Sequence, residues 1–215
     1  MDLLDRVIEP GSDLLVRVDE ILSRHGAPAA HPVWALLHRL GVMPSVALDQ
    51  VAGLAPSDIS AAGTPLSGIA SDLHTAVASL PSDVTSRGAT ADGFGARWNG
   101  LARQIGDGAD RLSATAAAVA ELAAWAGTAR RDLAGVLGAC LGSAEAVLVR
   151  SASVTGDADS IRAAADIAAD VLESLAKTVD AGWQCFGDWS ALDAEIPVTV
   201  SAVDGPLVPN HIELH

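Results

Sequence analysis

The chain has 215 residues, of which half are hydrophobic but only 3% aromatic, and it contains no tyrosine. This length is enough for one or two domains with a sizeable core. With 13 basic and 27 acidic residues, the formal net charge is −14, which repels the phosphates of nucleic acids and anionic membranes. We therefore expect closely packed alanine-rich helices and exclude nucleic-acid binding and docking on anionic membranes.

The most hydrophobic run, residues 133–144, is bounded by Asp132 and Glu145 and is shorter than the roughly 20 residues that span a bilayer. The N-terminal MDLLDRVIEPGSD lacks the basic start and apolar block of a signal peptide. We expect no membrane span, and either a cytoplasmic location or export without a cleaved leader. Cys140 and Cys185 fall at apolar helical positions and are expected to be small buried residues, with a bridge between two helices as the alternative.

Residues 1–55 are predicted to form a region of short helices separated by breakers. Asp13 is expected to cap the first helix, which ends at His25. Two shorter helices follow at 32–41 and 44–51, each begun by a proline.

Residues 54–65 (LAPSDISAAGTP) have the composition of a loop or hinge. Apolar residues at helical spacing then predict a helix from Leu66 to Leu80, which Pro81 either ends or kinks. Glycines and small polar residues between positions 82 and 95 predict a turn.

The strongest periodic pattern predicts one helix of roughly 55–60 residues, with a coiled-coil type of seam. A set of residues spaced seven apart is apolar throughout: Ala91, Trp98, Ile105, Leu112, Val119, Ala126, Leu133, Cys140 and Val147. The companion set, three residues later in each heptad, is partly apolar: Phe94, Leu101, Gly108, Thr115, Leu122, Ala129, Val136 and Ser143. The position after each companion is mostly alanine or glycine, which favours close antiparallel packing against another helix.

Gly156 ends this pattern, and Asp157 or Asp159 is expected to cap a further long helix with apolar residues from Ile161 to Trp189. Residues 191–215 are predicted to be an extended or disordered tail. The whole is thus an all-α chain: short helices at 1–55, a long antiparallel helical hairpin plus a third long helix at 56–190, and the tail.

No motif for a nucleophile, a phosphate group or a structural metal is present, and the six histidines are scattered. We therefore predict no enzymatic activity, no catalytic or metal site and no cofactor; the alternative is an active site assembled from distant segments. Arg130, Arg131 and Asp132 are interpreted as a solvated helix face. Exposed tryptophans would be candidate hot spots for a partner, with burial within the chain as the alternative. The candidate helix-packing and partner interface consists of Trp98, Ile105, Leu112, Val119, Trp125, Leu133, Gly138 and Gly142.

The segment SRGATADGF at 86–94 resembles the hairpin turn of the WXG family of small type VII (ESX) secretion substrates. Gly88 matches the motif glycine, and Phe94 matches the aromatic residue that follows it. Ser86 takes the place of the motif tryptophan, and Arg87 takes the variable position between the two. The literal triplet Trp98-Asn99-Gly100 lies on the seam of the long helix and is the weaker match. The resemblance covers residues 30–150.

The resemblance implies a non-enzymatic interaction protein of type VII secretion, whose hairpin pairs with itself or with another WXG-like hairpin. Because the chain has no tyrosine, the Tyr-x-x-x-Asp/Glu secretion signal of the family is absent. Export would then depend on a partner that carries the signal, or the protein would stay in the cytoplasm. The alternatives are the N-terminal targeting domain of a larger secreted toxin and a helical bundle that binds a lipid or small molecule.

Overall fold

The computed structural model describes residues 2–80, 89–152 and 156–193, with side chains left out at 89–94, 185, 186 and 188–193. Every regular element in the described residues is an α-helix, which confirms the all-α class. The tail at 191–215 lies almost wholly outside the described residues. The helices are α1 (Leu3–His25), α2 (Val33–Leu40), α3 (Pro44–Ala52), α4 (Pro56–Ser79), α5 (Ala89–Leu141), α6 (Ala144–Ser151) and α7 (Ala158–Asp193).

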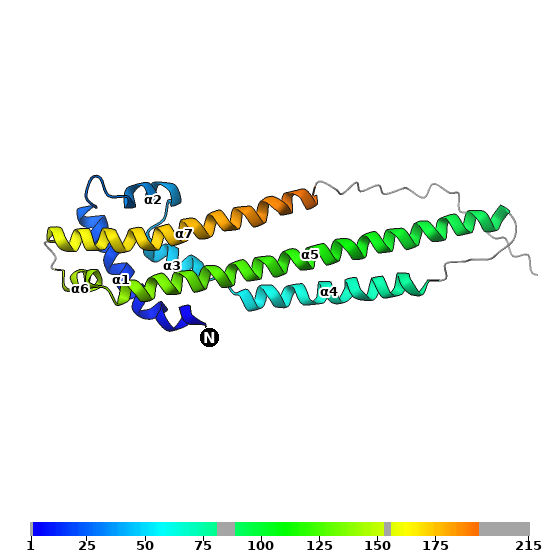
Figure 1. Ribbon diagram of the computed structural model, residues 1–215, viewed down its shortest axis with the longest axis horizontal. Coiled ribbons are helices and arrows are strands. Elements are labelled where there is room, and N and C mark those ends of the chain that lie inside the picture. Colours follow the sequence, from blue (N-terminus) through cyan, green and yellow to red (C-terminus); the bar gives the residue numbers. More distant parts are fainter. Residues whose placement is uncertain (1, 81–88, 153–155, 194–215) are drawn as a thin grey trace, which may run out of the picture.

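The 53-residue helix α5 is the spine of an elongated molecule (Figure 1). Helix α4 runs antiparallel along its N-terminal half, and among the described elements α4 contacts α5 alone. Helices α1, α3, α6 and α7 pack around the C-terminal half, where α7 also runs antiparallel to α5, and α2 contacts α7. One end of α5 is therefore in a bundle, whereas the other has a single neighbour.

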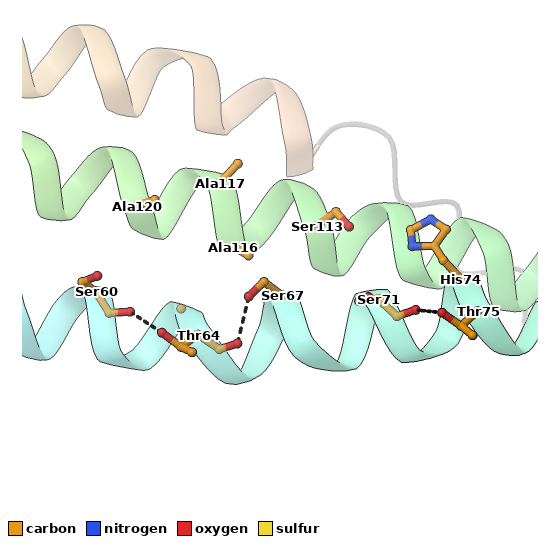
Figure 2. A pocket seen from close by; sticks show the side chains of 11 residues that line it. Ser60, Thr64, Ser67, Ser71, His74, Thr75, Ser113, Ala116, Ala117 and Ala120 are labelled. Atoms are coloured by element: carbon orange, nitrogen blue, oxygen red, sulfur yellow. Dashed lines mark hydrogen bonds between the residues drawn. The ribbon is translucent and has the colours of Figure 1, made fainter.

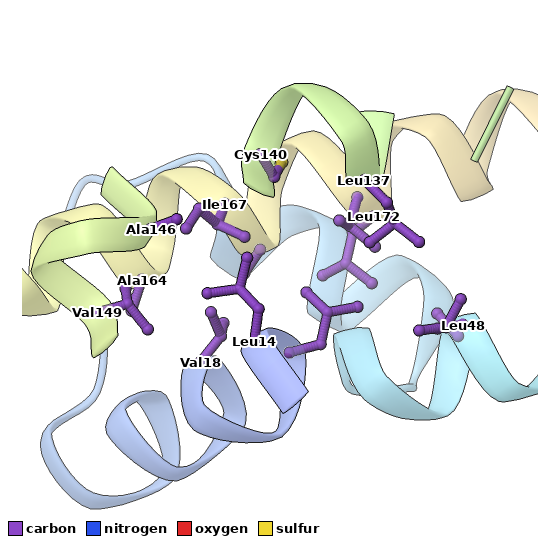
Figure 3. Close-up of a cluster of buried hydrophobic side chains, with 14 of the residues drawn as sticks. Leu14, Val18, Leu48, Leu137, Cys140, Ala146, Val149, Ala164, Ile167 and Leu172 are labelled. Carbon is purple, nitrogen blue, oxygen red and sulfur yellow. The ribbon is translucent and has the colours of Figure 1, made fainter. Parts of the chain in front are cut away.

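The hydrophobic core lies in the bundle (Figure 3). Leu14 of α1, Leu48 of α3, Leu137 of α5 and Leu172 of α7 are at most 1% exposed and meet in it. A Cβ added at Gly11 of α1 would lie 3.3 Å from Leu137, so the glycine lets α1 and α5 approach closely. Many of the other core residues on α7 are alanines, whose small side chains let the helix axes lie close together.

Helix α1 begins eleven residues earlier than the sequence predicts. Asp2, rather than Asp13, is its N-cap, and Asp2 and Asp5 form a reciprocal capping box. Pro10 lies inside the helix, where the capping box and the fully buried Leu4 stabilise the turns before it. Helices α2 and α3 follow the prediction within two residues, and Gly41 ends α2 with a φ of 67°.

The prediction of a loop at 54–65 was wrong, because α4 begins at Pro56 and continues through Pro65. Pro56 occupies the first turn, where its missing N–H costs nothing. Pro65 is exposed on the side away from α5, so the carbonyl that it leaves unpaired can reach water. Packing of Gly63 and Ala70 against α5 holds the helix together across this position.

The prediction of one uninterrupted helix to Val147 was also wrong. Helix α5 ends at Leu141, and α6 follows at an angle of 69° after Gly142 and Ser143. The Ser143 hydroxyl caps α6 by accepting a hydrogen bond from the backbone N–H of Ala146 at 3.2 Å. The bend places Ala146 and Val149 in the core and leaves Val147 63% exposed.

The predicted start of α7 is confirmed at Asp157. Its carboxylate accepts a hydrogen bond from the Ser160 N–H at 2.6 Å, and the Ser160 hydroxyl accepts one from the Asp157 N–H at 3.2 Å. These bonds hold the pKa of Asp157 below its ordinary value.

Candidate interaction surface on the arm

We call α4 together with residues 89–123 of α5 the arm. Between Gly95 and Ala117 of α5, Ala109 is the one buried residue, and on α4 only Gly63 and Ala70 are buried. Both helices thus use one narrow stripe to contact each other and expose their remaining faces (Figure 1). The arm is the part of the described molecule with the most helix surface left without a neighbour.

The seam of the arm differs in one respect from the predicted seam. One half of the observed seam is the predicted set of apolar residues spaced seven apart. The other half consists of the small residues that directly follow the predicted companion positions. Among them Ala102, Ala109, Ala116 and Ala123 are half-buried or buried. The companions Leu101 and Thr115 are instead exposed. Alanine in the seam brings the two backbones close together, as the small side chains predict.

Gly63 marks the closest approach within this seam. A Cβ added there would lie 3.1 Å from the Cγ1 of Val119 and 3.7 Å from the Ala116 carbonyl oxygen. Only a residue without a side chain fits at this distance without displacing Val119. Val119 therefore packs inside the chain, as a seam residue should.

A groove of about 640 Å³ runs along one side of the arm (Figure 2). Its lining consists of small and hydroxyl-bearing side chains with one histidine: Ser60, Gly63, Thr64, Ser67, Ser71, His74, Thr75, Ser113, Ala116, Ala117 and Ala120. The hydroxyls of Thr64, Ser67 and Thr75 each donate to a carbonyl of their own helix. Such a lining offers close contact to a neighbouring helix and carries little charge.

His74 connects the two helices of the arm. Its Nε2 lies 2.9 Å from a carboxylate oxygen of Asp110 on α5, and its Nδ1 lies 2.9 Å from the carbonyl oxygen of Ala70. The Asp110 carboxylate, helped by the Ala70 carbonyl, raises the pKa of His74 above the ordinary histidine value. Because both ring nitrogens are occupied, the hydroxyls of the groove have no histidine lone pair to activate them.

Apolar side chains also lie exposed on the arm. Ile69 of α4 is 50% exposed and Leu101 of α5 is 48% exposed. Helix α4 contains no lysine or arginine, so its outer face combines small, hydroxyl and apolar residues with Asp58, Asp72 and His74. A surface of this composition can pack against the face of another helix.

The structure separates the predicted interface residues into three groups. Trp98, Ile105, Leu112 and Val119 are half-buried in the arm, and Leu133 is 3% exposed in the core of the bundle. Gly138 and Gly142 are exposed; a Cβ at Gly138 would meet nothing within 4 Å, and one at Gly142 only carbonyls of its own helix. The predicted turn residues Ser86, Arg87 and Gly88 and the side chain of Phe94 lie outside the described residues.

Trp125 faces a second neighbour, which was one of the two possibilities open from the sequence. Its indole N–H donates to the Thr178 carbonyl of α7 at 3.0 Å, and its ring lies 3.1 Å from the position of a Cβ added at Gly182. Trp125 therefore fastens α5 to α7 at the inner end of the arm. Trp183, one residue beyond Gly182, is 71% exposed.

Arg130 was missed as a structural residue, because the sequence places it in a polar run. Its side chain is only 9% exposed and donates to the carboxylates of Asp2 and Asp5 and to the carbonyls of Ala52 and Leu54. The Arg130 guanidinium lowers the pKa of Asp2 to about 2. The only signal that could have indicated this role is a charged residue at position 130 within a seam-flanking set that otherwise consists of alanine, glycine and leucine.

The described residues contain no group of three or more histidine, cysteine or acidic side chains placed to hold a metal ion. Cys140 is buried, and burial raises the pKa of its thiol to about 11. The Cys185 side chain is outside the described residues, so pairing of the two cysteines stays untested.

Among the described helices, none is by itself long and apolar enough to cross a membrane; α5 from Gly95 and α6 meet the length and composition criteria only as a pair bent by 69°. No protein-family model matches the chain, and neither does any curated protein or solved structure.

Proposed function

We propose that this is a non-enzymatic helical interaction protein of type VII (ESX) secretion, whose arm is a WXG-like hairpin that pairs with another helical hairpin. The observation that carries the proposal is the arm itself: two long antiparallel helices with a narrow mutual seam and with exposed faces that no described element covers. Two-helix units of this kind bury additional apolar surface by packing in pairs.

Three further features support a helix as the partner. The groove beside the seam is lined by small side chains, which allow a third helix to approach closely. Ile69 and Leu101 supply exposed apolar contacts. The resemblance of residues 86–94 to the WXG turn supports the family assignment, and it rests on the sequence alone.

The groove gives no comparable support to a lipid-binding bundle, since it lacks the large apolar side chains that line such sites.

Size-exclusion chromatography with light scattering tests this proposal on the full chain, alone and mixed with the products of the neighbouring genes. We expect either a dimer or a complex with one of them. Ile69→Asp and Leu101→Asp should each weaken the association by about tenfold or more if they lie at the centre of the contact. Val147→Asp, at an apolar position on α6 that is still more exposed, is the control and should bind normally. A strict monomer that binds none of these proteins, or unchanged binding by both arm variants, would overturn the proposal.

A further inference from the structure

The contact between His74 and Asp110 is the only side-chain ion pair recorded between α4 and α5 in the described residues. His74 lines the groove, in the part of the arm far from the bundle, where the two helices otherwise share an apolar seam. The two side chains are partly open to solvent, with exposures of 47% for His74 and 75% for Asp110, so we expect a modest, local effect on the contact between the helices.

The two acceptors around His74 determine its protonation state. A carbonyl oxygen and a carboxylate oxygen can only accept hydrogen bonds, so both ring nitrogens must carry a proton for both contacts to form. The neutral imidazole has one N–H. In that form one of the two contacts is lost, and a nitrogen lone pair faces an oxygen lone pair.

His31 shows the opposite arrangement, although it also contacts an aspartate on another helix. Its Nε2 lies 2.9 Å from Asp166, but its Nδ1 accepts a hydrogen bond from the Val33 N–H at 3.2 Å. Both contacts of His31 are therefore satisfied by an imidazole with one proton. The requirement for two protons is specific to the arrangement at His74.

We propose that His74 and Asp110 form a proton-dependent latch, which fastens α4 to α5 when the imidazole is charged and loosens the outer part of the arm when it is neutral. The latch concerns the arm alone and does not depend on the identity of any partner. The raised pKa of His74 agrees with this geometry, because it reports that the charged form is the favoured one.

The other charges near the latch are exposed and of mixed sign. Helix α4 packs against α5 alone among the described elements. On α5, Asp107 and Arg111 flank Asp110, and on α4 Asp72 lies two residues before His74; all three side chains are exposed. Asp107 and Arg111 carry opposite charges and offset each other, so Asp110 remains the dominant partner.

The direction of the pH dependence follows from the raised pKa. The stabilisation from His74 is complete below the ordinary histidine pKa of about 6.5 and is lost as the pH rises through the higher value of the folded state. The arm should therefore be held most firmly on the acidic side of neutrality.

Nuclear magnetic resonance of the histidine side chains tests the latch directly on the full chain. We expect His74 to titrate above the ordinary histidine value of about 6.5, and Asp110→Asn to move the His74 midpoint down towards that value. The absence of any effect of Asp110→Asn on the His74 midpoint would overturn the proposal.

Thermal unfolding at pH about 6 and about 9, on either side of the histidine range, provides a second measurement. The wild-type protein should lose more stability between these values than His74→Gln does, because the variant cannot form the charged latch. His38→Gln should retain the wild-type pH dependence. Identical pH dependence in wild type and His74→Gln would contradict the latch and leave the proposed interaction function unaffected.

Discussion

Arg130 shows how a single charged residue can organise three parts of this chain. It lies on α5, reaches the capping carboxylates at the start of α1, and donates to carbonyls at the end of α3 and just beyond it. The guanidinium has several donors in a fixed plane, which suits simultaneous contacts of this kind. Asp19 acts similarly on a smaller scale, because its carboxylate on α1 accepts from the Ser45 N–H at 3.2 Å and so caps α3.

Replacing Arg130 with methionine should destabilise the protein by about 2–4 kcal/mol. Asp2 and Asp5 are 45% and 38% exposed and can return to water, so most of the loss comes from the carbonyls of Ala52 and Leu54 that lose their donor. Chemical denaturation followed by circular dichroism measures the difference. Arg131→Met, at the exposed neighbouring position, is the matched control; equal losses in the two variants would show that the Arg130 contacts carry no special weight.

At the scale of the elements, the two glycines of α4 differ in how closely α5 packs against them. Gly63 lies against Val119, where a side chain has no room, whereas Gly68 on the same helix has nothing within 4 Å of its Cβ position. Glycine in a helix costs about 1 kcal/mol relative to alanine unless close packing compensates for it. Within α4, only Gly63 is packed closely enough to compensate for this cost.

We therefore expect substitutions at these two glycines to change stability in opposite directions. Gly68→Ala should raise the free energy of unfolding by up to about 1 kcal/mol, the ordinary gain in helix propensity. Gly63→Leu should lower it, because the new side chain must push Val119 and α5 away. The melting temperatures of the two variants and the wild type provide the comparison. A stabilising Gly63→Leu would mean that α4 and α5 do not pack as described.

At the scale of the whole molecule, burial is distributed unevenly along α5. The bundle contains the large fully buried side chains, including Leu14, Leu48, Leu137 and Leu172, whereas the seam of the arm buries mainly alanine and glycine. Less apolar surface per residue means a weaker hydrophobic contribution to stability. The arm and the bundle should therefore differ in local stability.

Hydrogen exchange should reveal this difference directly. Backbone amides of α4 are expected to exchange faster, after correction for intrinsic rates, than those of α1 and the buried part of α7, because the arm can open without unfolding the bundle. Leu137→Ala, which should cost about 2–5 kcal/mol in the core, ought to speed exchange in the bundle more than in α4. Uniform protection along the chain would contradict a separately opening arm.

Apart from residues 3–13 and 56–65, the sequence by itself determined which segments are helical and where several of them begin and end. Pro32, Gly41, Pro44 and Asp157 act on their immediate neighbours, so their effects could be predicted correctly from local chemistry. The apolar period likewise placed Leu133 and Val119 on packed faces, because a repeat near 3.5 residues requires a buried stripe.

The tertiary structure alone decided where packing between helices overrides the local sequence signals for helix ends. Helix α4 continues through Pro65 because α5 supports it, and α5 bends after Leu141 because α6 gains core contacts through Ala146 and Val149. The role of Arg130 and the partnership of His74 with Asp110 join residues distant along the chain. Such contacts depend on which helix faces meet, and a periodic pattern states that a face is buried without stating what covers it.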